Sequence, residues 1–220
     1  PVTSSTSDCK IIDIADRGYI PSWSRSIAPH LQIPAQNESQ KVSPIRWLLF
    51  MEDDSSTRPK LSSRMAKKLE ALGDTVIRVK KSYQPLHSDH GGTYYLNTSQ
   101  PDDYHLLFKQ LDSENCYPQR IVDFWTITGN NPEQGCTLAD TYYHALPLAQ
   151  ALTAQKHLRT VDIWLVTDQT VQVNQERIIP IKSTLFGPAL VLPQESPNIA
   201  CRLLDVEVVG RSGEASIDEL

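Results

Sequence analysis

Glycine is scarce in this sequence, and it is missing where a nucleotide-binding fold needs it most. The 220 residues include 9 glycines, none of them between Trp47 and Leu72. That stretch holds an apolar run, a polar turn and a segment with apolar residues at helical spacing, which predicts a strand, a turn and a helix. Dinucleotide-binding domains place G-x-G-x-x-G in such a turn, because glycines let the backbone approach the pyrophosphate. Here the turn, residues 52–57, reads EDDSST, and its carboxylates would repel a pyrophosphate.

Cysteine motifs are missing as well. The four cysteines, Cys9, Cys116, Cys136 and Cys201, show no C-x-x-C spacing and no clustering. We therefore expect reduced, mostly packed thiols, and neither a disulfide framework nor a cysteine metal site.

Excess basic charge and long apolar runs are also absent. The formal net charge is -5, which argues against nucleic-acid or anionic-membrane partners. No run approaches the roughly 18 apolar residues of a membrane span. The sequence starts at Pro1 without an initiator Met or a signal-peptide core, so we expect a fragment of a longer, soluble, cytoplasmic polypeptide.

Recognisable catalytic motifs are absent too. None of the eight tyrosines is followed four residues later by Lys or Asn, the pair expected of a short-chain-type reductase. The nucleophile elbow G-x-S-x-G of hydrolases does not occur. Thr128-Gly129 matches half of a phosphate turn, but Asn130-Asn131-Pro132 follows in place of further glycines. The sequence therefore predicts no catalytic, cofactor-binding or metal-binding residue.

Two sets of polar residues leave alternatives open. His87 and His90 with Asp89 are either an incomplete metal cluster or solvated surface, whereas His105 and His144 are expected to be partly buried helix residues. A positive helix face is either simply solvated or a docking surface for an acidic partner; it consists of Lys60, Arg64, Lys67 and Lys68.

Strand and helix patterns alternate along most of the chain. Apolar and β-branched runs predict strands at 47–51, 75–80, 93–97, 120–128, 161–167 and 199–207, with an edge strand at 19–26. Helices are expected at 61–72, ending before Gly73, and from Pro101 onward. A Thr137–Asp140 capping box predicts a helix to about Gln155 that Pro147 kinks or divides. Residues 83–92 are expected to form a loop, and residues 180–192 a partly helical piece interrupted by Gly187-Pro188.

This alternation, with 40% apolar residues to build a core, predicts an α/β fold. We expect a degenerate (truncated) Rossmann-like domain with a mostly parallel sheet and helices on both faces. Trp47, Trp125 and Trp164 fall in predicted central strands and are expected to pack under the helices. Trp23 falls in the edge strand, where a neighbouring domain could cover it.

Several stretches together resemble one family. They are Tyr19-Ile-Pro-Ser-Trp-Ser-Arg-Ser26, Trp47-Leu-Leu-Phe50, Asp103-Tyr-His-Leu-Leu107, Arg120-Ile-Val-Asp-Phe-Trp125, and Pro193-Gln-Glu-Ser-Pro197 running into Cys201-Arg-Leu-Leu-Asp205. In their order and spacing they resemble the structural (non-catalytic, N-terminal) subdomain of a type I modular polyketide synthase ketoreductase.

The resemblance implies a domain organisation: a linker over 1–18, the structural subdomain over 19–209, and a tail or linker over 210–220. In that family the second half binds NADPH and reduces a β-keto group on a chain carried by acyl carrier protein. No catalytic, cofactor or metal residue transfers to this sequence, because no position matches those motifs. The implied partners are therefore the catalytic subdomain and adjacent synthase domains.

Two situations fit this resemblance equally. The chain is either the first half of a working ketoreductase or a lone pseudo-ketoreductase kept as a spacer. The alternative from another class is a stand-alone Rossmann-like enzyme or nucleotide-binding protein with an atypical site.

Overall fold

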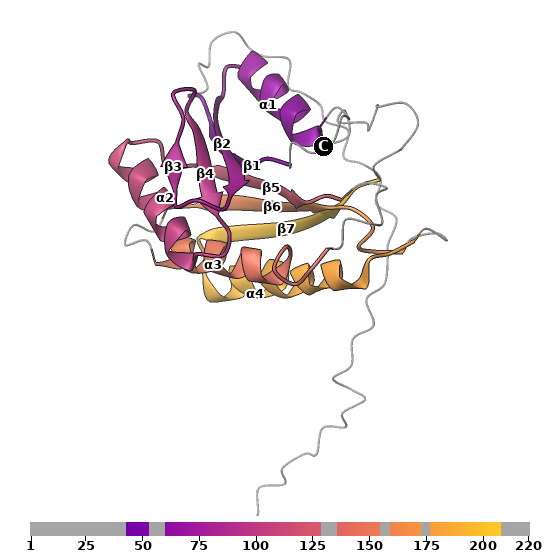
Figure 1. Ribbon diagram of the computed structural model, residues 1–220. Helices are drawn as coiled ribbons and strands as arrows, with labels where there is room; N and C mark the ends of the chain where they lie inside the picture. The colour runs from indigo at the N-terminus through magenta and orange to yellow at the C-terminus, as the bar shows by residue number, and fades with distance from the viewer. Residues whose placement is uncertain (1–42, 53–59, 129–135, 155–158, 173–176, 208–220) are drawn as a thin grey trace, which may run out of the picture. The chain divides into compact units, whose positions relative to one another are not determined.

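Seven strands join into one sheet in the computed structural model of the chain (Figure 1). The structure describes residues 43–52, 60–128, 136–154, 159–172 and 177–207. Across the sheet the strand order is β3-β4-β2-β1-β5-β6-β7, and each neighbouring pair is parallel except β3 with β4. The strands are β1 (Arg46–Phe50), β2 (Thr75–Ser82), β3 (His87–Ser88), β4 (Thr93–Asn97), β5 (Arg120–Thr126), β6 (Val161–Thr167) and β7 (Ile199–Asp205).

The strand β1 lies in the middle of the sheet because its residues are apolar on both faces. Leu48, Leu49 and Phe50 are fully buried, as expected for a parallel strand covered on both sides. Trp47 is in register with Val76 of β2 on one side and with Arg120 of β5 on the other. The chain thus adds strands in both directions from β1, which is the doubly wound arrangement.

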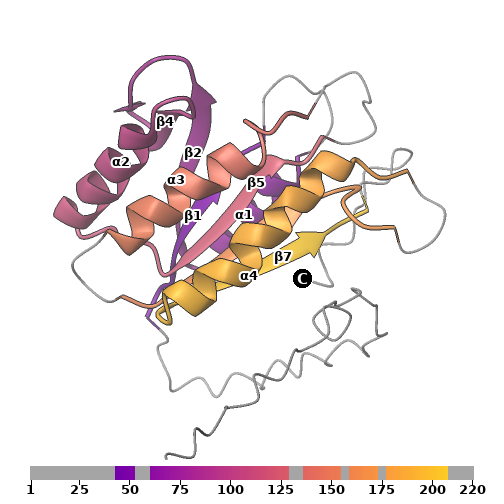
Figure 2. The same ribbon diagram turned by 90° about the horizontal axis from the view of Figure 1, so that it is seen from below.

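Helices cover the two faces unequally. The helix α1 (Leu61–Ala71) lies on one face, and α2 (Pro101–Ser113), α3 (Tyr142–Thr153) and α4 (Phe186–Glu195) lie on the other (Figures 1 and 2). The predicted mostly parallel sheet with helices on both faces is therefore confirmed.

Each face of the sheet has its own hydrophobic core. The cluster under α2, α3 and α4 includes the large side chains Phe50, Tyr104, Phe108 and Trp125. The cluster on the α1 face is smaller and includes Trp47, Leu69 and Phe124. Alternation along β5 sends Val122 and Phe124 to the α1 face and Ile121 and Trp125 to the opposite face.

The end of α1 agrees with its sequence signal. Gly73 has φ +89, a conformation that an L-residue rarely adopts. Its amide donates to the carbonyl of Glu70 at 3.0 Å, and the amide of Asp74 donates to that of Leu69 at 3.1 Å. The predicted glycine at the helix C-terminus is confirmed.

The segment 83–92, predicted to be a loop, contains a short strand. His87 and Ser88 form β3, which pairs antiparallel with β4 through His87↔Tyr95 and Ser88↔Tyr94. The prediction was wrong because two residues are too few to show a period of alternation.

The helix α3 begins later than the capping pattern predicts. The Thr137 hydroxyl and amide both donate to the Asp140 carboxylate, at 2.7 and 3.1 Å, but these residues form a turn and the helix starts at Tyr142. Pro147 is buried inside one continuous helix, so the predicted division into two is wrong. The predicted C-terminal end of this helix, residue 155, lies outside the described residues.

Gly187-Pro188 does not interrupt the segment that follows β6. A 3₁₀ helix, η2 (Pro180–Leu185), leads directly into α4, and both residues lie in the first turn of α4. A proline is tolerated there, because first-turn amides have no intrahelical acceptor. The edge strand predicted at 19–26, with Trp23, lies outside the described residues, as do residues 1–18 and 210–220.

No helix in the described part of the chain is both long enough and apolar enough to cross a membrane.

Candidate functional site

The strand order identifies where a ligand would bind in a fold of this type. In doubly wound sheets ligands bind outside the carboxyl ends of the strands, where the strand order reverses. Here that point lies between β1 and β5, because β1 continues to β2 on one side and meets β5 on the other. The residues that follow β1, β5 and β6 are therefore the candidate site.

The N-terminus of α1 is the place where a dinucleotide fold holds its pyrophosphate. Here the Glu52 carboxylate, just after β1, accepts a hydrogen bond from the amide of Ser62 at 2.8 Å. The Ser62 hydroxyl in turn accepts one from the amide of Glu52 at 3.3 Å. Lys60, the N-cap residue, makes no side-chain cap hydrogen bond, so Glu52 supplies the negative charge that the helix dipole favours.

This arrangement determines what the helix N-terminus can do chemically. A phosphate group would compete with the Glu52 carboxylate for the Ser62 amide, and the two negative charges would repel each other. No glycine stands between residues 47 and 72, so the backbone here carries a Cβ at every position. The residues present do not fit a pyrophosphate. Positions 53–57 of the predicted closed turn lie outside the described residues.

A buried ammonium group joins the carboxyl ends of β5 and β6. Lys182 of η2 is fully buried, and its Nζ donates to the Thr128 hydroxyl at 2.9 Å, to the Asp168 carbonyl at 2.9 Å and to the Asp168 carboxylate. Thr128 also donates its amide to the same carboxylate at 3.1 Å. These contacts pair the polar groups that follow β5 and β6, on one side of the switch point. Thr128 is therefore engaged by Lys182 and Asp168, whereas Gly129 lies outside the described residues.

The carboxylate of Asp205, at the end of β7, tethers the segment after β6. It accepts hydrogen bonds from the amides of Thr170 and Val171, at 3.1 and 2.8 Å. Burial raises the pKa of Asp205 above its usual range, and the negative charge of Asp168 adds to the rise, although both amides oppose it. Asp205 is thus a structural acceptor that joins β7 to this segment.

A second buried network links α2, β5 and α3. His144 has 1% of its surface exposed, and so does Asp123, while Tyr104 has none exposed. His144 Nε2 lies 2.6 Å from Asp123 Oδ2, and the Tyr104 hydroxyl lies 2.7 Å from His144 Nδ1. Burial raises the pKa of Tyr104, with Asp123 and Asp103 contributing. A Tyr-His-Asp series could move protons if a substrate reached it, but these three side chains have almost no surface through which to meet one.

The sequence analysis predicted less burial for His144 than the structure shows. This residue was expected to be partly buried, yet it lies in the core with its ring centroid 4.5 Å from that of Trp125. The signal that could have revealed the network is Asp123 itself, because an acidic residue inside the apolar run RIVDFWT needs a buried partner. Lys182 carries the same kind of signal, because it directly follows the apolar run Ile178-Ile-Pro-Ile181 in the sequence.

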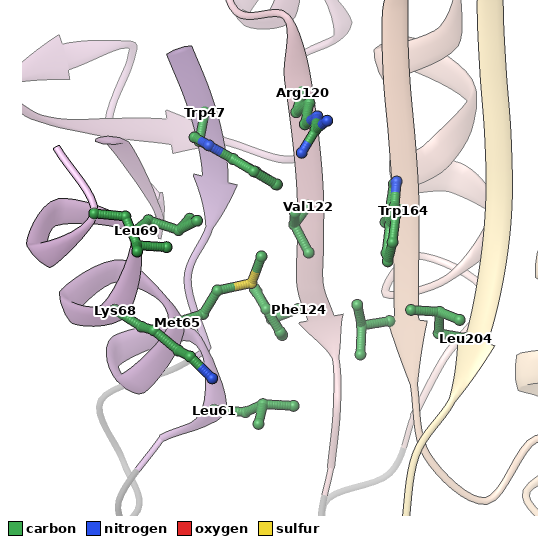
Figure 3. Close-up of a pocket in the computed structure, with 12 residues that line it drawn as sticks. Trp47, Leu61, Met65, Lys68, Leu69, Arg120, Val122, Phe124, Trp164 and Leu204 are labelled. Carbon is green, nitrogen blue, oxygen red and sulfur yellow. The ribbon is translucent and has the colours of Figure 1, made fainter. Parts of the chain in front are cut away.

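An apolar groove runs along the α1 face of the sheet (Figure 3). Its volume is about 220 Å³, below the range of roughly 300–1,000 Å³ of small-molecule sites. Trp164 lines this groove, is half-buried and packs against the cluster on the α1 face, so its predicted burial is confirmed only in part, whereas Trp47 and Trp125 are buried as predicted. The groove lies on the α1 face of the sheet and extends to Val166 and Leu204, which are each one residue from the carboxyl ends of β6 and β7.

The remaining candidate residues are spread over the surface. His87 is exposed, with Nδ1 2.9 Å from the Pro85 carbonyl and its ring stacked on Tyr95 at 4.9 Å. Within the ranges that the structure describes, no group of three or more metal-ligating side chains comes together. His105 is half-buried on α2. The basic residues Lys60, Arg64 and Lys68 each have an interaction partner.

Comparison with known proteins gives a family match over most of the chain. A family model described as beta-ketoacyl synthase-like, N-terminal, matches residues 47–219. No curated protein sequence matches significantly.

Solved structures share the fold. One is described as the adenylation, ketoreductase and pseudo Asub multidomain structure of a keto acid-selecting NRPS module, with TM-score 0.65 and 19% identity over 82% of this chain and 15% of that one. Another is an N-terminal ketoreductase from the macrolactin assembly line, with TM-score 0.57 and 22% identity over 74% of this chain and 32% of that one. A short-chain dehydrogenase/reductase variant from Serratia marcescens gives TM-score 0.51 and 13% identity, over 80% of this chain and 85% of that one.

These matches confirm the resemblance predicted from the sequence and the Rossmann-like fold that it implies. The chain spans 15% and 32% of the length of the two ketoreductase-containing structures.

Proposed function

The chain belongs to the family described as beta-ketoacyl synthase-like, N-terminal, and from this premise we propose that it is the non-catalytic structural subdomain of a polyketide synthase ketoreductase. In this role it scaffolds the NADPH-dependent catalytic half, or neighbouring modifying domains, during β-keto processing of intermediates bound to acyl carrier protein. The parent activity is NADPH-dependent β-ketoreduction, and this chain contributes architecture to it.

The observation that carries the proposal is the hydrogen bond between the Ser62 amide and the Glu52 carboxylate at 2.8 Å. The fold provides a helix N-terminus at the place where a dinucleotide's pyrophosphate binds. A protein that used this place for NADPH would leave the amide available and the surroundings free of carboxylates. The chain's own carboxylate on that amide supports a scaffold that has kept the fold without the cofactor site.

The polar groups beyond the turn support the same proposal. The Lys182 ammonium is fully buried and donates to Thr128 and Asp168, so it stabilises the junction of β5, β6 and η2. The Tyr104–His144–Asp123 series lies inside the core, where it fixes α2 and α3 against β5. Both networks are consistent with a structural role, because buried polar groups in folded proteins are normally paired with one another.

The proposal assigns NADPH binding to the catalytic half. That half and the adjacent synthase domains are the proposed partners, with acyl carrier protein engaged only indirectly. Two of the structures with this fold are described as a multidomain NRPS module and a ketoreductase of an assembly line. A position inside a larger multidomain chain is consistent with these descriptions.

A turnover assay tests the proposal. The purified chain is mixed with NADPH and a β-ketoacyl thioester, and NADPH absorbance is followed beside a matched sample that contains an intact ketoreductase. The expected result is no NADPH oxidation above the rate without protein, while the intact ketoreductase consumes NADPH. Turnover by the chain alone would overturn the proposal and favour the rival class, a stand-alone Rossmann-like enzyme with an atypical site.

A further inference from the structure

Among the described helices, only α1 lies on its face of the sheet (Figure 1). Parallel strands are normally covered by helices on both faces. The groove beside α1 is lined by Trp164 of β6 and Leu204 of β7, and both side chains are only half-buried. The described residues therefore leave apolar surface of β6 and β7 for a further segment to cover.

The charged residues that line this groove have one sign. The lining includes the basic residues Lys68 and Arg120 and no acidic residue. The Arg120 guanidinium lies 4.9 Å from the centre of the Trp47 ring, and Figure 3 shows the Lys68 side chain reaching into the groove from α1. Lys68 already has an interaction partner, but its ammonium still adds positive charge beside the apolar lining. An occupant that combines apolar side chains with negative charge would therefore complement the groove.

The chain itself has such a segment shortly after β7. Residues 214–220 read EASIDEL, with the apolar Ile217 and Leu220, three acidic residues and no basic one. The preceding strand, β7, contributes Leu204 to the groove, and the described residues end three positions later, at 207. The segment thus matches the groove in polarity and in charge, and the chain leads toward it from the groove itself.

The segment can also reach across the groove. The sheet residues of the lining belong to β1, β5, β6 and β7, which together span three strand spacings of about 4.8 Å, or about 14 Å. Ile217 is ten residues beyond Glu207, and ten residues of chain extend at most about 35 Å. Because the segment is tethered, its effective concentration at the groove is on the order of 1 mM, so weak contacts are enough to hold it there.

We propose that residues 214–220 bind in the groove beside α1. Ile217 and Leu220 contact its apolar lining, and the acidic side chains lie toward Lys68 and Arg120. The groove is then a docking site for a segment of the same chain, which covers β6 and β7 on the face where α1 does not. The docking is independent of the proposed function, because neither NADPH nor a catalytic half takes part in it.

Thiol labelling of the folded chain tests the docking. A protease site introduced after Glu207 lets the chain fold intact before it is cut and the released fragment is removed. Met65→Cys places a thiol in the groove, and mass spectrometry follows its alkylation by iodoacetamide. We expect labelling at least about tenfold faster after the cut, which corresponds to docking with an intrinsic dissociation constant of about 0.1 mM or tighter. The control is Leu106→Cys on α2, which is 50% exposed and should be labelled at the same rate before and after the cut.

Two changes within the segment test its chemistry in the intact chain. Ile217→Asn places a polar group against the apolar lining and is expected to speed labelling of the groove thiol at least about threefold. Asp218→Lys combined with Glu219→Lys reverses the charge that faces the groove and should also speed labelling. Ile217→Leu keeps the segment apolar and is the reference for both.

Methionine methyl NMR reads the same groove if Met65→Cys does not fold. The chain has two methionines, Met51 and Met65, so their methyl resonances can be assigned from one substitution. The Met65 resonance should shift when the segment is cut off. An unmoved Met65 resonance overturns the proposal.

The labelling rates separate the outcomes. Faster labelling after the cut and in at least one of the two segment variants, with Leu106→Cys unaffected, supports the docking. A rate that the cut does not change overturns the proposal and assigns the groove to a different occupant. It is also overturned if neither segment variant differs from Ile217→Leu, or if Leu106→Cys is accelerated as much as the groove thiol.

Discussion

The carboxylate of Glu52 and the amide of Ser62 lie 2.8 Å apart, across the start of α1. They are ten residues apart in the sequence, and they join the end of β1 to the first turn of the helix that follows. Through this bond the Glu52 side chain supplies a hydrogen-bond acceptor for a backbone amide at the N-terminus of α1. The strand-turn-helix unit is thereby stabilised without a bound anion.

Removal of this carboxylate should destabilise α1. Glu52→Ala is expected to lower the free energy of unfolding by about 1 kcal/mol, as for the loss of a helix cap. Glu52→Gln keeps an acceptor oxygen and should retain most of that stability. The measurement is urea denaturation, with the exposed Glu195→Ala as the control. A Glu52→Ala variant as stable as Glu195→Ala would show that the bond contributes nothing.

The His144 network should make a larger contribution to stability. His144→Leu leaves Oδ2 of the buried Asp123 carboxylate without its partner, while the Trp125 amide still donates to Oδ1, and is expected to cost about 3–5 kcal/mol. Tyr104→Phe removes one hydroxyl and leaves His144 Nδ1 unpaired, which should cost about 1–3 kcal/mol. Urea denaturation gives both values. A larger loss of stability for Tyr104→Phe than for His144→Leu would contradict the pairing of His144 with Asp123.

Asp140 should make stability depend on pH. Burial alone would raise the pKa of Asp140, but the Thr137 hydroxyl, the Lys81 ammonium and the Thr137 amide hold it below its usual value. A lowered carboxyl pKa stabilises the fold above the unfolded value of about 3.9, and this contribution is lost as pH falls through the folded pKa.

Thr137→Val tests this linkage because it removes only the hydroxyl that donates to Asp140 at 2.7 Å. The variant should raise the pKa of Asp140, seen by NMR titration of its carboxyl carbon. It should also be less stable by at most about 1 kcal/mol near neutral pH, and this difference should shrink below about pH 3. A stability difference that does not change with pH would rule out the carboxylate as its source.

Cys201 should be chemically inert in the folded chain. Burial, with the nearby charges of Asp123 and Asp162, raises the pKa of Cys201 to about 12. The reactive thiolate is then rare near pH 8, so alkylation by iodoacetamide should be slower than in the unfolded chain by on the order of a hundredfold or more. Mass spectrometry of the labelled peptide gives both rates. Equal labelling of Cys201 with and without urea would contradict its burial.

Much of the fold follows from local sequence signals. The strand β1 and the helix α1 were predictable because the local signals agree: an apolar run indicates the strand, helical spacing indicates the helix, and Gly73 marks where the helix ends. The two-residue strand β3 was not, since its pairing with Tyr94 and Tyr95 depends on tertiary contact. Likewise the bonds between Thr137 and Asp140 exist as the pattern suggests, but they close a turn that precedes α3.

The candidate site was predictable only in part. The acidic turn after β1 could be read from the sequence, whereas the contact between Glu52 and Ser62 depends on how the strand and the helix pack. The buried pair of Lys182 and Asp168 lies 14 residues apart, and His144 is 21 residues from Asp123. No periodicity connects such residues, so their pairing emerges only in the folded chain.

Titration of the purified chain with NADPH tests the central claim most directly. Calorimetry or NADPH fluorescence is recorded beside a dinucleotide-binding reductase as the positive control. Because the Glu52 carboxylate engages the Ser62 amide and the turn has no glycine, we predict no saturable binding up to about 1 mM NADPH. Saturable binding with a dissociation constant in the micromolar range would contradict the claim, since it would require a phosphate site in a domain that we propose to be a scaffold.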